Sequence, residues 1–256
     1  MRILFIGDVV GHTGCQAISK YLPEIKKQFA VDFAILNGEN AAFHGMNKKI
    51  TGQFFKDGAD GITSGNHMWD DDGIYDIIDN EKRMIRPMNW VEDKPGRGAM
   101  ILEKNGNRVL VVNCLGSLFM GDDVHDPFRA VDEQIRDYAL GQDIDGIVVD
   151  FHTETSAEKQ AMGTFLDGRV SLVVGTHTHV PTADYQVLPG GTAYITDIGM
   201  TCDYDSNIGV RKDLMMERFT GAREKDVNFE CATGDPTLCA VLVDLNKQTG
   251  LAESIQ

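Results

Sequence analysis

The sequence has few cysteines and no paired cysteine motif. Its five cysteines are scattered along 256 residues, and no Cys-x-x-Cys occurs. This pattern argues against a disulfide framework and against a zinc site made of thiolates, and it favours a reducing compartment. We therefore expect a cytoplasmic protein.

Long hydrophobic runs are also absent. No stretch of the sequence approaches the about 18 apolar residues that a membrane-spanning helix needs. The apolar run at residues 2–6 meets Asp8 almost at once, so it predicts a buried strand and no signal peptide. These features predict no membrane partner.

Basic residues are outnumbered. Lys and Arg total 24 against 39 Asp and Glu, and the net charge is −15. Binding to duplex nucleic acid rests on phosphate neutralisation by Lys and Arg, so a stable complex with duplex nucleic acid is not expected. An anionic substrate would have to be attracted locally. The length allows one or two domains, and we predict a single domain over residues 1–256.

Strand patterns alternate with helix patterns along the chain. The sequence Asn105-Gly106 between two apolar runs predicts a hairpin, and further strands are expected at residues 192–195 and 237–243. Parallel units followed by hairpins favour an α/β fold with two mixed sheets packed face to face and helices outside. Helices are expected at residues 13–29, 48–58, 70–79, 130–140 and 156–166.

Polar side chains follow five short apolar runs. In open α/β sheets the ligand lies beyond the carboxyl ends of the strands, where these residues are expected. One such residue means little, because Asp and Asn are ordinary turn residues, but five strand ends together favour a metal site. The residues are Asp8, Glu39, Asn66, His152, His177 and His179.

The alternating His177-Thr178-His179 closes the apolar run at residues 170–174. Continued extended backbone would turn both imidazoles to one face, where they could hold a metal ion. A pair of solvated loop histidines is the alternative for this motif taken alone. Imidazole and oxygen donors without thiolate suit iron, manganese or zinc.

The motifs in this order resemble those of the calcineurin-like metallophosphoesterases, and most closely the YmdB-type branch of small bacterial cytosolic phosphodiesterases. The likeness extends over nearly the whole chain and implies an α/β/β/α sandwich of two mixed sheets flanked by helices. The motifs are Gly7-Asp8, Glu39-Asn40, Gly65-Asn66-His67, an isolated His152 and Gly175-Thr-His-Thr-His179.

The resemblance implies two divalent metal ions, with iron or manganese favoured and zinc also suitable, bridged by Glu39. It assigns Asp8, Asn40 and His179 to one ion. It assigns Asn66, His152 and His177 to the other. His67 would face the substrate as general acid, or as a donor to the transition-state oxygens. No substrate-binding residue is assigned.

Two positions depart from the wider superfamily. Val10 stands where a His is usual, and Glu39 stands where a bridging Asp is usual. We expect Asn40 to replace the missing His, which would make the first ion the more labile one.

The activity implied by the resemblance is hydrolysis of a small phosphodiester by attack of a metal-bridging hydroxide on phosphorus. Cyclic nucleotides, either 2′,3′-cyclic or 3′,5′-cyclic monophosphates, are the expected substrates. A metal hydrolase of another bond, such as an amide, and a metal-binding regulatory protein with weak activity are the alternatives. The sequence leaves the oligomeric state open, a homo-oligomer included.

Four further residues have weaker signals. His44 is expected to be solvated, with a role at the rim of the site left open. Arg129 could lie near a phosphate, but a structural salt bridge is favoured. Asp197 could orient a histidine ligand. Asp150 is expected to point to a face of its own and to be structural.

Overall fold

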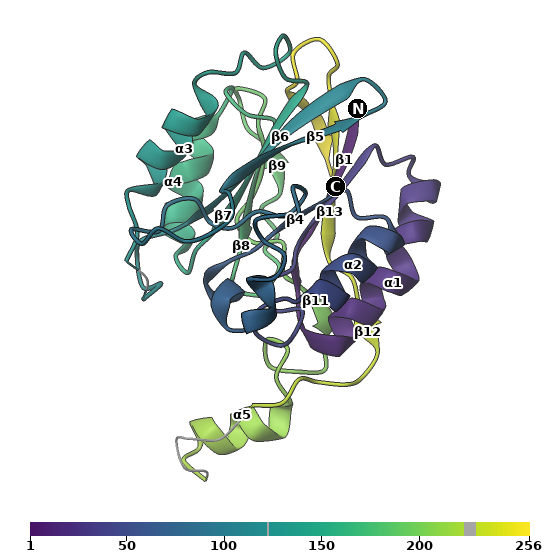
Figure 1. Ribbon diagram of the computed structural model, residues 1–256, viewed down its shortest axis with the longest axis vertical. Coiled ribbons are helices and arrows are strands. Elements are labelled where there is room, and N and C mark those ends of the chain that lie inside the picture. Colours follow the sequence, from purple (N-terminus) through teal and green to yellow (C-terminus); the bar gives the residue numbers. More distant parts are fainter. Residues whose placement is uncertain (122, 223–228) are drawn as a thin grey trace.

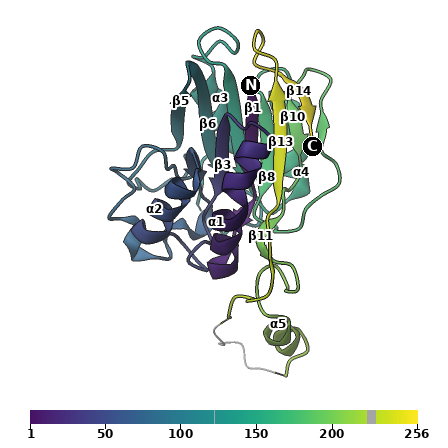
Figure 2. The ribbon, with the colours of Figure 1, turned by 90° about the vertical axis from the view of Figure 1, so that its right-hand side faces the viewer.

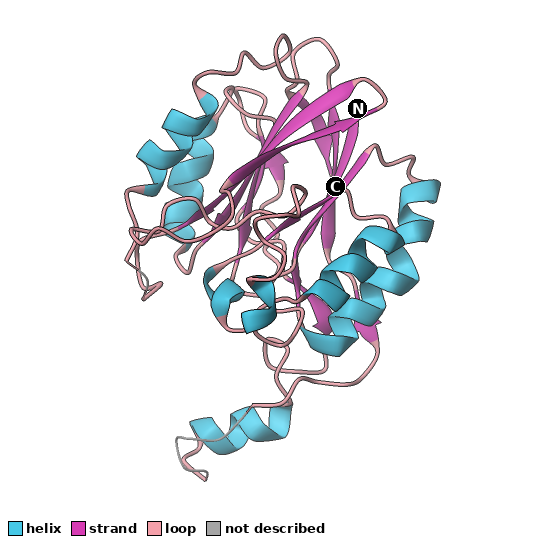
Figure 3. Ribbon diagram, in the orientation of Figure 1, coloured by secondary structure: helices cyan, strands magenta, loops and turns pink. Residues whose placement is uncertain are grey.

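A computed structural model describes residues 1–121, 123–222 and 229–256. Two mixed sheets lie face to face and helices cover the outer faces (Figures 1 and 3). The predicted α/β/β/α sandwich is therefore confirmed.

The first sheet is built around the N-terminal strand. Here β1 (Arg2–Ile6) pairs in parallel with β3 (Phe33–Asn37) and antiparallel with β13 (Ala240–Leu245). The two outermost strands are β4 (Gly61–Thr63), parallel to β3, and β14 (Ala252–Ile255), antiparallel to β13.

The second sheet begins with the predicted hairpin. Strands β5 (Ala99–Lys104) and β6 (Asn107–Leu115) are joined at Asn105-Gly106, which confirms that prediction. Parallel neighbours follow, and the remaining strands in spatial order are β7 (Gly146–His152), β8 (Leu172–Thr176), β10 (Ala193–Ile195) and β9 (Gln186–Val187).

Strand alternation explains how the layers hold together. In β1, Ile3 and Phe5 pack into the core between the two sheets. Leu4 and Ile6 point the other way, into the core beneath α1 and α2. Because successive side chains of a strand leave opposite faces, a continuous apolar run is the expected pattern for a strand buried on both sides.

Each outer face carries a pair of helices. The helices α1 (Gly11–Gln28) and α2 (Lys48–Asp57) cover the first sheet, with Leu22 and Phe54 buried against it. The helices α3 (Pro127–Ile135) and α4 (Ser156–Leu166) cover the second sheet through Val131 and Met162. The predicted helix at residues 130–140 thus begins and ends earlier than expected.

The predicted helix at residues 70–79 was wrong. Two short 3₁₀ turns, η1 (Asn66–Trp69) and η2 (Asp72–Ile74), lie in this region. The side chain of Asp71 accepts a hydrogen bond from the backbone of Gly73, so it favours a turn here over a continuous helix.

One helix was not expected from the sequence. In both views α5 (Lys212–Phe219) projects from the body of the molecule (Figures 1 and 2). A small third sheet, β12 (Pro236–Thr237), β11 (Met200–Asp203) and β2 (Asp8–Val9), lies where this projection meets the body. Among the described residues no helix has the length and apolarity needed to cross a membrane.

Candidate metal centre

The five polar strand ends meet at one edge of the sandwich, as predicted. Asp8 follows β1, Glu39 and Asn40 follow β3, and Asn66 follows β4. From the second sheet, His152 is the last residue of β7, and His177 and His179 follow β8. All seven predicted metal ligands are therefore brought into one region, although they come from distant parts of the sequence.

His152 lies at the centre of one cluster of donor atoms. Its Nε2 atom is 3.0 Å from Oδ1 of Asn66, 3.1 Å from Nδ1 of His177 and 3.2 Å from Oε2 of Glu39. Four donor atoms thus point at a common space. This is the set that the resemblance assigned to the second ion, with Glu39 as the shared carboxylate.

The other cluster is formed by Asp8, Glu39 and His179, each of which offers a donor atom within 4.8 Å of the others. The side chain of Asn40 borders it, with Nδ2 3.3 Å from Nε2 of His179 and 2.8 Å from Oε1 of Glu39. A half-turn of the Asn40 amide would present its oxygen instead. Glu39 belongs to both clusters, as a bridging carboxylate must.

Each histidine of the two clusters also has a polar partner at its second ring nitrogen. His152 Nδ1 is 2.8 Å from Oγ1 of Thr176, and His179 Nδ1 donates to the carbonyl of Ile208 at 2.9 Å. His177 Nε2 lies 3.2 Å from the carboxylate of Glu154. Metal-binding histidines almost always carry such a bond, because it fixes the ring and leaves the other nitrogen free for the ion.

Asp150 fixes the tautomer of His152. The hydroxyl of Thr176 donates to Oδ1 of Asp150 at 2.7 Å, so it accepts from Nδ1–H of His152. Asp150 also accepts from Thr63 at 2.6 Å and from Asn37 at 3.0 Å. The expectation that Asp150 points to a face of its own was wrong: it lies two residues before His152 in β7, and residues two apart share a face.

The backbone of the His-x-His motif differs from the predicted extended form. His177 has φ 98° and His179 has φ 65°, values that are uncommon for residues other than glycine. Asp197 holds the turn by accepting from the backbone and hydroxyl of Thr178, and Lys159 pairs with Asp197 at 2.7 Å. Asp197 therefore orients the segment between the two histidines through Thr178.

A glycine is required beside the cluster at Gly65. A Cβ atom at this position would lie 2.0 Å from Oε2 of Glu39 and 2.4 Å from Nε2 of His152. Only a residue without a side chain lets the backbone pass this close to the donor atoms. The Gly in Gly65-Asn66-His67 therefore has a direct steric cause.

The electrostatics of the site fit bound cations. Oδ1 of Asp8 is buried without a hydrogen-bond partner, and burial raises the pKa of Asp8 to about 7. Burial acts to lower the pKa of His152, but the neighbouring Glu39 raises it to about 9. Burial, helped by His152, lowers the pKa of His177 to about 3. Divalent ions would give Asp8 its missing partner and would replace the proton that His152 otherwise holds beside Glu39.

A pocket opens at the ligand clusters, and His67 lines it together with Glu39 and His179. The Nδ1 atom of His67 is 2.9 Å from Oδ2 of Asp70, and its backbone N–H donates to Glu39 at 3.3 Å. The ring of His44 lies 4.7 Å from that of His67, and His44 lines the pocket too. The place of His67 suits a proton donor that faces the substrate, and His44 lies at the rim that the sequence left open.

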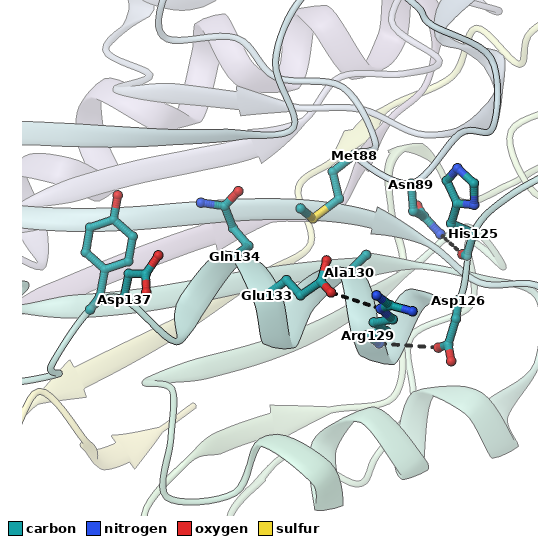
Figure 4. A pocket seen from close by; sticks show the side chains of 10 residues that line it. Met88, Asn89, His125, Asp126, Arg129, Ala130, Glu133, Gln134 and Asp137 are labelled. Atoms are coloured by element: carbon teal, nitrogen blue, oxygen red, sulfur yellow. Dashed lines mark hydrogen bonds and ion pairs between the residues drawn. The ribbon is translucent and has the colours of Figure 1, made fainter.

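A separate cavity of about 900 Å³ lies along α3, and none of the seven predicted ligands lines it. Its lining residues are shown in Figure 4. Arg129 lines it and pairs with Glu133 at 2.9 Å. The structural salt bridge favoured for Arg129 is therefore confirmed.

Sequence reasoning missed several contributors to the site, among them Thr176, Glu154 and Ile208. Thr176 and Glu154 lie within two residues of predicted ligands in the sequence, so proximity alone could have suggested them. Ile208 contributes a backbone carbonyl, for which the sequence carries no signal.

The chain matches known proteins over its whole length. A family model described as YmdB-like protein matches residues 4–256. A 2′,3′-cyclic-nucleotide 2′-phosphodiesterase of Bacillus subtilis (strain 168) is 44% identical over 100% of this chain and 96% of its own length.

Solved structures agree with this similarity. The crystal structure of a hypothetical protein from Thermus thermophilus has a TM-score of 0.91 and 37% identity, covering 100% of this chain and 97% of the other. A phosphatase of Mycoplasma pneumoniae has a TM-score of 0.91 and 31% identity, covering 100% and 92%. The NAD nucleotidase of Haemophilus influenzae shares the fold, with a TM-score of 0.60 at 12% identity, covering 100% of this chain and 55% of that one.

Proposed function

Because the chain belongs to the YmdB-like protein family, we propose that it is a dinuclear metal-dependent phosphodiesterase that hydrolyses cyclic nucleotides. The Bacillus subtilis relative makes 2′,3′-cyclic monophosphates the first substrates to consider, with 3′,5′-cyclic monophosphates second. Iron or manganese is the expected metal, and zinc also suits the donor set.

One observation carries this proposal. Two clusters of oxygen and nitrogen donors share Glu39, and every histidine in them is tied through its other ring nitrogen. Such bonds cost side-chain freedom, and they favour the ring orientations and tautomers that a metal ion needs. Solvated loop histidines would not show this pattern.

The site divides the chemistry among its residues. When bound, two divalent ions would supply activated water and offset the negative charge of the phosphate. One ion would be held by Glu39, Asp8, Asn40 and His179. The other would be held by Glu39, Asn66, His152 and His177. His67, held by Asp70, would deliver a proton to the leaving oxygen or donate to the phosphoryl oxygens.

The test is a substrate panel on protein purified without chelators. Metal content is measured first, and hydrolysis is then followed for bis(p-nitrophenyl) phosphate and for 2′,3′-cyclic and 3′,5′-cyclic nucleotides. The proposal predicts two ions per chain and hydrolysis of a 2′,3′-cyclic nucleotide. A protein that holds two ions but cleaves only amide substrates would favour the hydrolase of another bond. Tight ligand binding without turnover would favour a regulatory protein.

A further inference from the structure

Two chemically different kinds of residue line the pocket at the ligand clusters. The pocket encloses about 330 Å³, within the usual range for a small-molecule site. Four of the candidate metal ligands, Glu39, Asn40, His177 and His179, line it together with His67. Five apolar residues also line it and are called the apolar wall: Val10, Phe43, Ile208, Val210 and Phe229. A ligand with an anionic part and an apolar part would match both kinds of lining.

Two residues of the apolar wall are held in unfavourable backbone conformations. Phe43 has φ 77° and Ile208 has φ 51°. For bulky or β-branched residues such values are outliers, and outliers of this kind concentrate at functional sites. Ile208 is 47% exposed, so burial of its apolar surface does not account for its position.

The apolar wall is fixed directly to the candidate metal ligands. The carbonyl of Ile208 accepts from Nδ1 of His179 at 2.9 Å, and the backbone N–H of Phe43 donates to the carbonyl of Asn40 at 2.8 Å. Phe43 also packs against the buried cluster of Val10, Met200 and Cys202. The wall therefore keeps a constant place relative to a phosphate bound at the clusters.

We infer that the apolar wall is the subsite for the nucleobase of a cyclic nucleotide, with the base lying against Phe43 and Ile208 while the phosphate lies at the ligand clusters. This inference rests on the proposed function. Bases stack on aromatic side chains through a flat face that all of them share.

The same wall predicts weak discrimination between bases. Its five side chains carry no hydrogen-bond donor or acceptor, so they cannot pair with the edge of a base. Within the part of the chain that the structure describes, the polar residues of the pocket outside the clusters are His44, Glu154 and Thr178, beside His67. Adenine should therefore be preferred to uracil only through its larger stacking surface.

The experiment compares a substrate with a base and one without. Values of kcat/KM are measured for 2′,3′-cyclic AMP, 2′,3′-cyclic UMP and glycerol 1,2-cyclic phosphate, which has the same type of cyclic diester and no base. Phe43→Ala removes the ring. Ile208→Asn removes the apolar side chain but tolerates positive φ. Phe119→Ala is the control, because Phe119 also has positive φ (62°) and is 85% exposed outside the pocket.

In Phe43→Ala the ratio of kcat/KM for 2′,3′-cyclic AMP to that for glycerol 1,2-cyclic phosphate should fall at least about 5-fold, the lower end for loss of one stacking contact. Ile208→Asn should lower the same ratio, and Phe119→Ala should leave it unchanged. An unchanged ratio in Phe43→Ala would overturn the inference, even if kcat/KM fell equally for both substrates.

Failure of the proposed function can be told apart from failure of the subsite. If the wild-type protein hydrolyses none of these diesters, the phosphodiesterase proposal fails, and equilibrium dialysis with adenosine 3′-monophosphate decides the subsite. Weaker binding by Phe43→Ala than by wild type would support the subsite. Equal binding, or no binding by wild type, would refute it.

Discussion

The ring of His177 lies against the carboxylate of Glu154, with 3.2 Å between Nε2 of the ring and Oε2 of the carboxylate. This contact leaves Nδ1 of His177 to face Glu39 and His152. Glu154 is half exposed, so its removal should affect the histidine far more than the fold.

We expect Glu154→Ala to weaken metal affinity by about 10–100-fold, the usual effect of losing such a partner. Glu154→Gln keeps an acceptor oxygen and should lose less. Competition with a chromophoric chelator measures the affinities. Glu133→Ala is the control, since Glu133 is also half exposed but lies along α3. Equal affinities in Glu154→Ala and the control would contradict the assigned role.

Thr176 links the buried carboxylate of Asp150 to His152. In Thr176→Val the shape is kept but the hydroxyl is lost, so Oδ1 of Asp150 loses its donor. We expect the free energy of unfolding to fall by about 1–3 kcal/mol and metal affinity to fall with it. Urea denaturation and chelator competition measure the two. Thr176→Ser retains the hydroxyl and should stay near wild type in both, and a Ser variant as damaged as the Val variant would exclude this explanation.

His67 and Asp70 should affect the rate without affecting the metals. His67→Ala is expected to lower kcat by about 10²–10⁴-fold, the range for a positioned acid or base. Asp70→Asn should cause a smaller loss, because His67 keeps its ring and loses only its charged partner at Nδ1. Both variants should keep the wild-type metal content. His67 would instead be a ligand if His67→Ala lost metal as severely as His177→Ala.

The pH dependence of the metal-free protein follows from two buried groups. The pKa of His152 is raised from 6.5 to about 9, so its contribution to stability is complete below pH 6.5 and is lost as pH rises to 9. The pKa of Asp8 is raised from 3.8 to about 7, so its contribution to stability is also lost as the pH rises, between pH 3.8 and pH 7.

The Tm of the metal-free protein should therefore fall between pH 6.5 and pH 9, by about 2–4 °C for each kcal/mol lost. Added Mn²⁺ should raise Tm more at pH 9 than at pH 6.5, because the ion takes the place of the proton on His152. Thermal melts in chelator and in Mn²⁺ at both pH values provide the measurement. A Tm in chelator that rises over this range would show that the Glu39–His152 pair does not hold that proton.

The sequence was sufficient to predict where the site lies. Parallel strands bring their carboxyl ends to one edge of a sheet, so polar residues after apolar runs had to meet. Asp8 and His177 follow strands of different sheets, and the face-to-face packing of the two sheets makes them neighbours, with the backbone N–H of His177 3.3 Å from the Asp8 carboxylate. The hairpin at Asn105-Gly106 was predictable for a local reason, its turn chemistry.

The backbone of the site was not predictable in the same way. Positive φ at His177, His179 and Ile208 depends on tertiary contacts, such as the bonds from Thr178 to Asp197. No local pattern encodes these contacts. The projecting α5 was missed because its apolar residues do not form one buried stripe: Leu214 and Met215 are buried, whereas Phe219 is 74% exposed.

The charge of the site should decide between diester and monoester substrates. Asp8 and Glu39 offset only part of the charge of two divalent ions, and Glu154 adds a third carboxylate at the edge of the pocket. The remaining positive charge suits a diester monoanion better than a monoester dianion. The metal-loaded protein should therefore have a higher kcat/KM for bis(p-nitrophenyl) phosphate than for p-nitrophenyl phosphate.

Because Asn40 is a weaker donor than the histidine that Val10 replaces, the ion beside it should be the more labile, and assays without added Mn²⁺ should show activity falling as that ion is lost. Both claims, the preference for diesters and the lability of the ion beside Asn40, are tested by measuring kcat/KM for both substrates with and without Mn²⁺, together with the metal content. Faster cleavage of the monoester would refute the diesterase assignment. Full activity with one ion per chain would refute the need for both clusters, since Glu39 would then have no second ion to bridge.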